Sequence, residues 1–296
     1  MGMAAVVLWS TTIGVSRSIA QAVGPLTAGA AVFTLGAFLA FALGRARRPA
    51  EPERIRRRFL LWCGLLFATY ELTLYIAIGL VLDGQQLLEI GLINYLWPVL
   101  TVLCALPVLG LSVSWVIVPG IALALVGIAL VTTHAGTLSL TALVSHLQGN
   151  PVAYVSALVA ALTWALYSVL SRKWGPVGPH NSVAWFMLAS ALALWVGRAW
   201  AGEVSHWTLR AALETAFMGV ATSVAYWSWD IGVRNGDFGK VSVFSYLTPL
   251  FSTVVSCLYL GIGAGMRLWI GALLIVAGAW LSRAAARQRA ARPRAA

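Results

Sequence analysis

The chain has 296 residues, of which 60% are hydrophobic and 10% are charged, and its mean hydropathy is +0.86. Soluble domains carry about 25% charged residues, so this composition excludes a soluble globular domain and indicates a membrane protein. A net charge of +11 would suggest a nucleic-acid partner in a soluble protein. Here the basic residues gather between apolar runs, which is a sign of membrane topology, and no nucleic-acid partner is expected.

The apolar runs predict ten membrane-spanning helices, because roughly 20 apolar residues in a helix cross a bilayer. The predicted spans are residues 3–22, 25–43, 59–82, 86–108, 114–133, 151–171, 181–200, 209–232, 240–260 and 266–283. We therefore expect an all-α integral membrane protein. We expect no enzyme, because no nucleotide-binding or metalloprotease motif occurs and every histidine lies in or beside a predicted loop. No metal or cofactor is expected either, since the cysteines lie inside apolar runs without metal-ligand spacing.

Arginine and lysine predict the orientation of the spans. The segment 44–58 contains seven arginines, and short basic segments stay in the cytoplasm. With this segment inside, sixteen Lys and Arg fall on the cytoplasmic side and three on the outer side. One missed helix would invert every later loop, so this distribution favours ten spans with both termini cytoplasmic. The loop 134–150 has no Lys or Arg and is predicted to lie outside.

Residues recur between the two halves of the chain. A shift of 151 residues aligns the tetrapeptide 95–98 with 246–249, each beginning Tyr-Leu and ending in proline, and a shift of 155 aligns Trp9 with Trp164. Because each half has an odd number of spans, the repeats would be inverted in the membrane. The predicted parts are a first five-helix repeat at 1–134, an external connector at 135–150, a second, inverted repeat at 151–283, and a basic cytoplasmic tail at 284–296.

Proline and glycine mark special positions in these repeats. Pro98 and Pro249 interrupt apolar runs, and proline removes a backbone donor and clashes with the preceding turn, so they predict bent or broken helices that act as hinges beside a central cavity. The last span of each half carries glycines that permit close helix packing, either within a monomer, which we favour, or between two copies. These glycines are Gly120, Gly127, Gly271 and Gly278.

The sequence resembles the drug/metabolite transporter superfamily, specifically proteins with two tandem EamA-type repeats of five helices. The ten spans, Trp9 and Trp164, the two tetrapeptides ending in Pro98 and Pro249, and the glycines of the last span in each half carry this resemblance over the whole chain. Within the superfamily, the abundance of aromatic residues most resembles bacterial exporters of aromatic amino acids. The resemblance implies a multi-pass protein of the bacterial plasma (inner) membrane.

Aromatic and hydroxyl side chains at predicted membrane depth are the candidates for a substrate site. Trp9, Trp97 and Trp164 lie deep in their spans, where an indole N–H needs a partner that lipid does not offer. They line a cavity or pack between helices, and the sequence leaves both open. Tryptophans near the ends of spans are expected at the membrane interfaces, and they are Trp62, Trp115, Trp174, Trp200, Trp207, Trp227, Trp229 and Trp269. The full set of predicted substrate-binding residues is Trp9, Thr12, Tyr70, Glu71, Tyr75, Asn94, Tyr95, Trp97, Trp164, Tyr167, Ser168 and Tyr246.

Charged residues inside the spans are scarce. Glu71 is predicted at the bilayer centre, where three roles are open: binding a substrate ammonium, carrying a coupling proton, or hydrogen bonding within the bundle while protonated. Glu89, Glu214 and Asp230 are expected at the interfaces, with Arg210 one turn before Glu214. Arg17 either extends to the interface or binds a substrate carboxylate.

These residues predict a secondary transporter that exports small amphipathic metabolites, aromatic or bulky neutral amino acids first among them, by alternating access. A cavity poor in charge argues against nucleotide sugars and phosphates. Two alternatives remain at this stage: an exporter of drugs or cationic compounds with Glu71 as the anionic anchor, and a membrane sensor or assembly factor that transports nothing.

Overall fold

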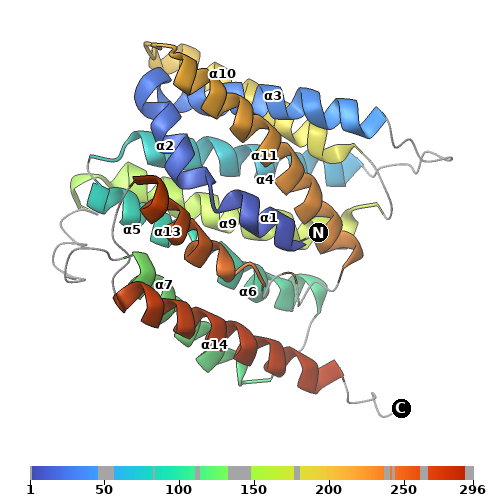
Figure 1. The fold of residues 1–296 in the computed structure, drawn as a ribbon. Coiled ribbons are helices and arrows are strands. Elements are labelled where there is room, and N and C mark those ends of the chain that lie inside the picture. The colour runs from blue at the N-terminus through green and yellow to red at the C-terminus, as the bar shows by residue number, and fades with distance from the viewer. Residues whose placement is uncertain are drawn as a thin grey trace.

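The computed structural model describes residues 2–45, 57–82, 84–110, 114–132, 148–176, 181–236, 241, 244–260 and 266–290 (Figure 1). Within these ranges all regular secondary structure is α-helical. The helices are α1 (Gly2–Trp9), α2 (Thr12–Val23), α3 (Pro25–Arg45), α4 (Arg57–Gly79), α5 (Gly84–Asn94), α6 (Trp97–Leu109), α7 (Ile117–Thr132), α9 (Pro151–Trp174), α10 (Ser182–Ala201), α11 (Leu209–Asn235), α13 (Leu247–Leu260) and α14 (Met266–Ala290).

Five segments are long and apolar enough to cross a membrane, and they are Met3–Val23, Pro25–Ala42, Arg57–Gly79, Pro151–Trp174 and Ser182–Ala201. Shorter apolar helices occupy Trp97–Leu109, Ile117–Gly127 and Trp269–Ser282. Large apolar side chains such as Phe38 and Leu61, each 70% exposed, point outward from α3 and α4. This surface suits a lipid environment and confirms the all-α membrane protein expected from the sequence.

The chain is interrupted between α1 and α2 and between α5 and α6, and α13 begins at the same level of the molecule. The break between α1 and α2 falls at Ser10 and Thr11, whose hydroxyls donate to the carbonyls of Val7 (2.5 Å) and Leu8 (2.8 Å) in the preceding turn. Side chains that bond the backbone in this way compete with the helix ladder, and this interruption was not expected from the sequence.

The break between α5 and α6 falls at Tyr95 and Leu96, and it places Pro98 in the first turn of α6. Proline is tolerated there because the N–H that it lacks has no partner within the helix anyway. The corresponding tetrapeptide behaves alike: a turn precedes Leu247, and Pro249 lies in the first turn of α13. Both prolines therefore begin a helix at the level where the chain is interrupted.

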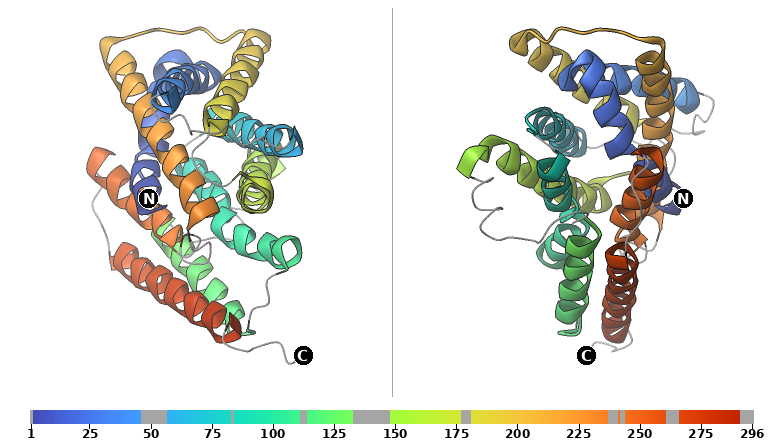
Figure 2. Two further views of the ribbon diagram at one scale, coloured as in Figure 1. Left: turned by 90° about the vertical axis from the view of Figure 1, so that its right-hand side faces the viewer. Right: turned by 60° about the vertical axis from the view of Figure 1, so that its left-hand side comes forward.

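Helices α7 and α14 form a separate antiparallel pair at one end of the molecule (Figures 1 and 2). A Cβ built on Gly278 would lie 2.6 Å from the Gly120 carbonyl oxygen, and one on Gly127 would lie 2.7 Å from the Gly271 carbonyl oxygen. The predicted glycines thus face one another across this pair, so the close packing that they permit occurs within the chain. At the opposite end, α3 packs against α10.

Several predicted features lie outside the described residues. They are most of the connector 135–150, the greater part of the basic segment 44–58, and the last residues of the tail 284–296. Helix α14 extends to Ala290, beyond the predicted end of the last span at 283.

Candidate functional site

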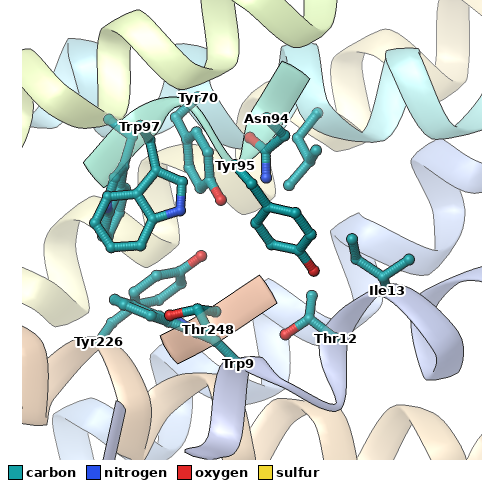
Figure 3. A pocket seen from close by; sticks show the side chains of 11 residues that line it. Trp9, Thr12, Ile13, Tyr70, Asn94, Tyr95, Trp97, Tyr226 and Thr248 are labelled. Carbon is teal, nitrogen blue, oxygen red and sulfur yellow. The ribbon is translucent and has the colours of Figure 1, made fainter. Parts of the chain in front are cut away.

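A cavity of about 40 Å³ lies at the level of the helix interruptions (Figure 3). Its wall is formed by side chains from α1, α2, α4, α9 and α11 and from the segments around the α5–α6 break and the start of α13. The lining residues are Trp9, Thr12, Ile13, Tyr70, Leu74, Asn94, Tyr95, Trp97, Trp164, Tyr226 and Thr248. Six of these side chains are aromatic and none is charged. A cavity that admits benzene has about 150 Å³, so binding a ring here requires the helices to move apart.

Tryptophan and tyrosine rings contact one another around this cavity, the tryptophans edge to face and the tyrosines at a tilt. The ring centroid of Trp9 lies 5.3 Å from that of Trp164 and 6.0 Å from that of Trp97, with interplanar angles of 88° and 84°. Tyr226 lies 5.4 Å from Trp9, and Tyr70 lies 4.8 Å from Trp164. Such geometries are favourable for aromatic pairs.

Three polar atoms in this wall have no hydrogen-bond partner among the described residues. They are the indole nitrogen Nε1 of Trp9, the amide oxygen Oδ1 of Asn94 and the hydroxyl Oγ1 of Thr248. The Asn94 and Thr248 side chains are 5% and 3% exposed. Buried polar atoms are nearly always paired, so these three point to a ligand or to water as their partner.

Glu71 lies behind the wall of the cavity. It is 2% exposed and does not line the cavity, although the preceding residue, Tyr70, does. The hydroxyl of Tyr226 donates a hydrogen bond to Oε1 of Glu71. The carboxyl group does not line the cavity and is bonded to a hydroxyl of the wall, which argues for hydrogen bonding within the bundle over direct contact with a substrate. Figure 3 shows the Tyr226 and Tyr70 hydroxyls turned toward the centre of the cavity.

Contacts on the two sides of this site recur at a constant spacing along the chain. The hydroxyls of Ser16 and Tyr75 are 3.5 Å apart, and the residues 155 positions later, Ser171 and Asp230, are joined by a hydrogen bond of 3.2 Å. Arg17 donates to the carbonyl of Ile78 at 3.3 Å, so its guanidinium is bound to the end of α4 and not to the cavity.

The same spacing continues beyond this pair of contacts. Arg172, 155 positions after Arg17, donates to the carbonyl of Val233 at 3.2 Å. The two members of the Glu71–Tyr226 hydrogen bond are themselves 155 residues apart. So are Trp9 and Trp164, whose rings are in contact. Matched positions in the two halves therefore either make matching contacts or meet each other at the cavity.

The structure places seven of the twelve predicted substrate-binding residues in the cavity wall: Trp9, Thr12, Tyr70, Asn94, Tyr95, Trp97 and Trp164. The other five lie elsewhere. Beside Glu71, these are Tyr75, which faces Ser16; Tyr167, packed on Phe67 and Phe186; Ser168, which accepts from Trp229; and Tyr246, buried beside Tyr95 in a separate apolar cluster.

Four residues of the wall were not predicted: Ile13, Leu74, Tyr226 and Thr248. The repeat contained a signal for two of them. Tyr226 lies 155 residues after Glu71, and Thr248 lies 151 residues after Trp97. Ile13 and Leu74 lie one helical turn after Trp9 and Tyr70, where an apolar residue is indistinguishable by pattern from ordinary core.

One expectation about α11 is wrong. Trp229, predicted at the interface, is 1% exposed, and its ring centroid lies 5.2 Å from those of Trp9 and Trp97. Asp230 is likewise 1% exposed and accepts a hydrogen bond from Ser171. Side chains of α1, α6 and α9 bury this part of α11. The position of a residue along its span does not predict whether neighbouring helices bury it. Glu214 does pair with Arg210, at 2.7 Å, while the Glu89 side chain lies outside the described residues.

Apolar helices with interruptions around a buried cavity are the features of a membrane transporter. The chain belongs to the EamA-like transporter family, whose model matches residues 1–133 and 151–284. It is therefore a multi-pass inner-membrane protein of that family, as the resemblance in the sequence implies.

The chain is similar over nearly its whole length to proteins named aromatic amino acid exporter YddG. It is 30% identical over 291 residues to that of Salmonella typhimurium (98% of this chain and 97% of the relative) and 31% identical over 297 residues to that of Escherichia coli (97% of each). A crystal structure with 29% sequence identity superposes with a TM-score of 0.79, covering 97% of this chain and 96% of that one.

Proposed function

We propose that the protein exports small amphipathic metabolites, aromatic or bulky neutral amino acids first among them, by alternating access. The observation that carries this proposal is the cavity: the described part of its wall has six aromatic side chains, no charged side chain and three unpaired polar atoms. Aromatic rings suit an aromatic side chain, and a few polar groups suffice to orient a ligand. The relatives named as aromatic amino acid exporters support the same substrate class.

The proposed architecture is ten transmembrane helices in two inverted repeats, with α1–α2 and α5–α6 each serving as one interrupted span. Three observations support it: the contacts that recur after 155 residues, the antiparallel pairing of Gly120 with Gly278, and that of Gly127 with Gly271. Inverted repeats characteristically place the site between interrupted helices at their interface. The repeat limits remain those proposed from the sequence, 1–134 and 151–283, and we propose a monomer.

The helix ends support an orientation with both termini in the cytoplasm. The right-hand side of Figure 1 shows the N-terminus together with the ends of α3, α9, α11 and α14 that face the basic segments. Short basic segments stay in the cytoplasm, so this side is the proposed inner side. The ends of α2, α10 and α13 lie on the left-hand side, which is the proposed outer side.

Polar contacts close the proposed outer side. The Glu214 carboxylate of α11 accepts hydrogen bonds from Ser18 of α2 (3.1 Å), Arg210 (2.7 Å) and Tyr259 of α13 (2.7 Å). We call Ser18, Arg210, Glu214 and Tyr259 the outer cluster. At the other end, Lys173 of α9 donates to the Val108 carbonyl of α6 at 2.8 Å. Alternating access requires these two sets of contacts to break in turn, with the helix interruptions as hinges at Pro98 and Pro249.

The direct test is uptake of labelled phenylalanine or tryptophan into proteoliposomes. Wild-type protein is expected to transport, whereas Trp97→Ala and Trp164→Ala abolish uptake because each removes a ring from the cavity wall. Since loss of a buried tryptophan also destabilises a protein by about 3–5 kcal/mol, the folded fraction of each variant is measured by size-exclusion chromatography. Normal uptake by both variants would refute the aromatic cavity as the transport site.

The structure weakens the alternative of a cationic-compound exporter anchored by Glu71, since this carboxyl group lies outside the cavity wall and accepts from Tyr226. Transport of lipophilic cations without amino acids would restore that alternative. A protein that transports nothing is distinguished by single cysteines at positions 94–98. Labelling from each side of the membrane in turn supports a transporter, and labelling from neither side supports a sensor or assembly factor.

A further inference from the structure

The three unpaired polar atoms of the cavity wall differ in what they can bind. The Asn94 amide oxygen only accepts a hydrogen bond, the Trp9 indole nitrogen only donates one, and the Thr248 hydroxyl does either. Leaving such atoms buried and unpaired costs free energy, and lipid offers them no partner. Two further unpaired atoms among the described residues, in Tyr246 and Ser282, do not belong to the cavity wall.

Each of the three atoms stands beside a different helix interruption. Trp9 is the last residue of α1, Asn94 is the last residue of α5, and Thr248 is the second residue of α13. The atoms therefore line one space from three segments, and these segments would move relative to one another if the proposed hinges at Pro98 and Pro249 bend. A ligand that bonds all three would link the occupied site to the conformation of both halves.

We propose that these uncharged groups recognise the two charged ends of an amino acid substrate, an inference that rests on the proposed function. The Asn94 amide oxygen accepts from the α-ammonium group, and the Trp9 indole N–H and the Thr248 hydroxyl donate to the α-carboxylate. The aromatic wall holds the side chain. Because no charged side chain among the described residues lines the cavity, these dipoles supply the hydrogen bonds that an ion pair would otherwise supply.

Neutral recognition of a zwitterion fits an exporter better than ion pairs would. A buried carboxylate or guanidinium left behind after release would be uncompensated in the empty site, whereas an amide, a hydroxyl and an indole are satisfied by water. The present volume of about 40 Å³ accommodates water but no amino acid. Water and substrate therefore alternate as partners of the same three atoms.

The experiment compares three competitors of labelled phenylalanine uptake in proteoliposomes. Unlabelled phenylalanine has both charged ends, 3-phenylpropionate lacks the ammonium group, and phenethylamine lacks the carboxylate. Asn94→Leu is expected to weaken competition by phenylalanine at least about tenfold, the amount expected for one hydrogen bond to a charged group, and to leave 3-phenylpropionate unchanged. Asn94→Asp keeps an acceptor and adds a charge, so phenethylamine competes better than in the wild type.

The carboxylate end is tested by changes that remove a hydrogen-bond donor. Thr248→Val and Trp9→Phe remove a donor while retaining most of the side chain. Both variants are expected to weaken competition by phenylalanine and by 3-phenylpropionate and to leave competition by phenethylamine unchanged. Thr101→Val and Trp229→Phe are the matched controls, because their polar atoms already donate to the Trp97 carbonyl (2.7 Å) and the Ser168 hydroxyl (3.3 Å). The controls keep the wild-type order of the three competitors.

The outcomes separate the two proposals. If wild-type protein transports phenylalanine and the Asn94, Thr248 and Trp9 variants keep the wild-type ratios among the competitors, recognition by these atoms is refuted and the proposed function stands. If wild-type protein transports no aromatic amino acid, the proposed function fails and this inference fails with it.

Discussion

Replacing Gly278 with alanine should destabilise the monomer by forcing α7 and α14 apart. The new Cβ would lie 2.6 Å from the Gly120 carbonyl oxygen, 2.7 Å from the Ala124 backbone nitrogen and 3.0 Å from the Ala124 Cβ. A relaxed contact between two carbon atoms is about 3.5–4.0 Å, so the helices would have to separate by roughly 1 Å. Backbone atoms on both sides cannot rotate away, and overpacking of this kind costs about 1–3 kcal/mol.

Thermal unfolding in detergent measures this effect with a thiol-reactive dye. Cys63 is fully buried and reacts only once the bundle opens. Gly278→Ala is expected to lower the midpoint by several degrees, and Gly127→Ala to do the same. Gly149→Ala is the control, because a Cβ there meets nothing within 4 Å. A variant as stable as wild type, or one that dissociates a dimer without lowering the midpoint, would refute packing within the monomer as the role of these glycines.

Three further predictions concern polar contacts. Tyr226→Phe leaves the buried Glu71 carboxyl without this hydroxyl donor, so the variant should lose about 1–3 kcal/mol of stability in the same melting assay. Glu71→Gln keeps an acceptor and should lose less stability. The opposite order would contradict the assigned hydrogen bond. The Glu203 carboxylate caps the start of α3 by accepting three hydrogen bonds, so Glu203→Ala should lose about 1–2 kcal/mol of stability. An unchanged midpoint would show that this cap is dispensable. Tyr259→Phe weakens the outer cluster and should speed labelling from outside of a cysteine placed in the cavity wall; unchanged labelling would exclude the cluster as a gate.

The helical architecture was predictable because a membrane imposes one simple requirement. Each span must be apolar and must satisfy its own backbone, so hydropathy and charge predicted helices whose limits mostly lie within a few residues of those observed. The break before Pro98 was predictable for the same reason, since proline cannot continue the hydrogen-bond ladder. The break at Ser10 and Thr11 was not, because hydroxyls that bond a carbonyl are common in unbroken helices and only neighbouring packing decides the outcome.

Composition, proline and glycine constrain each helix locally, so the class of protein, the family resemblance and the residue types available to a site could be predicted from the sequence. Which side chains meet depends on the tertiary structure. Trp229 joins the central rings and Tyr226 donates a hydrogen bond to Glu71, and both depend on how α11 packs against α1, α3 and α9. The rotation of a helix about its axis is set by its neighbours, and in a uniformly apolar span the sequence pattern does not encode that rotation.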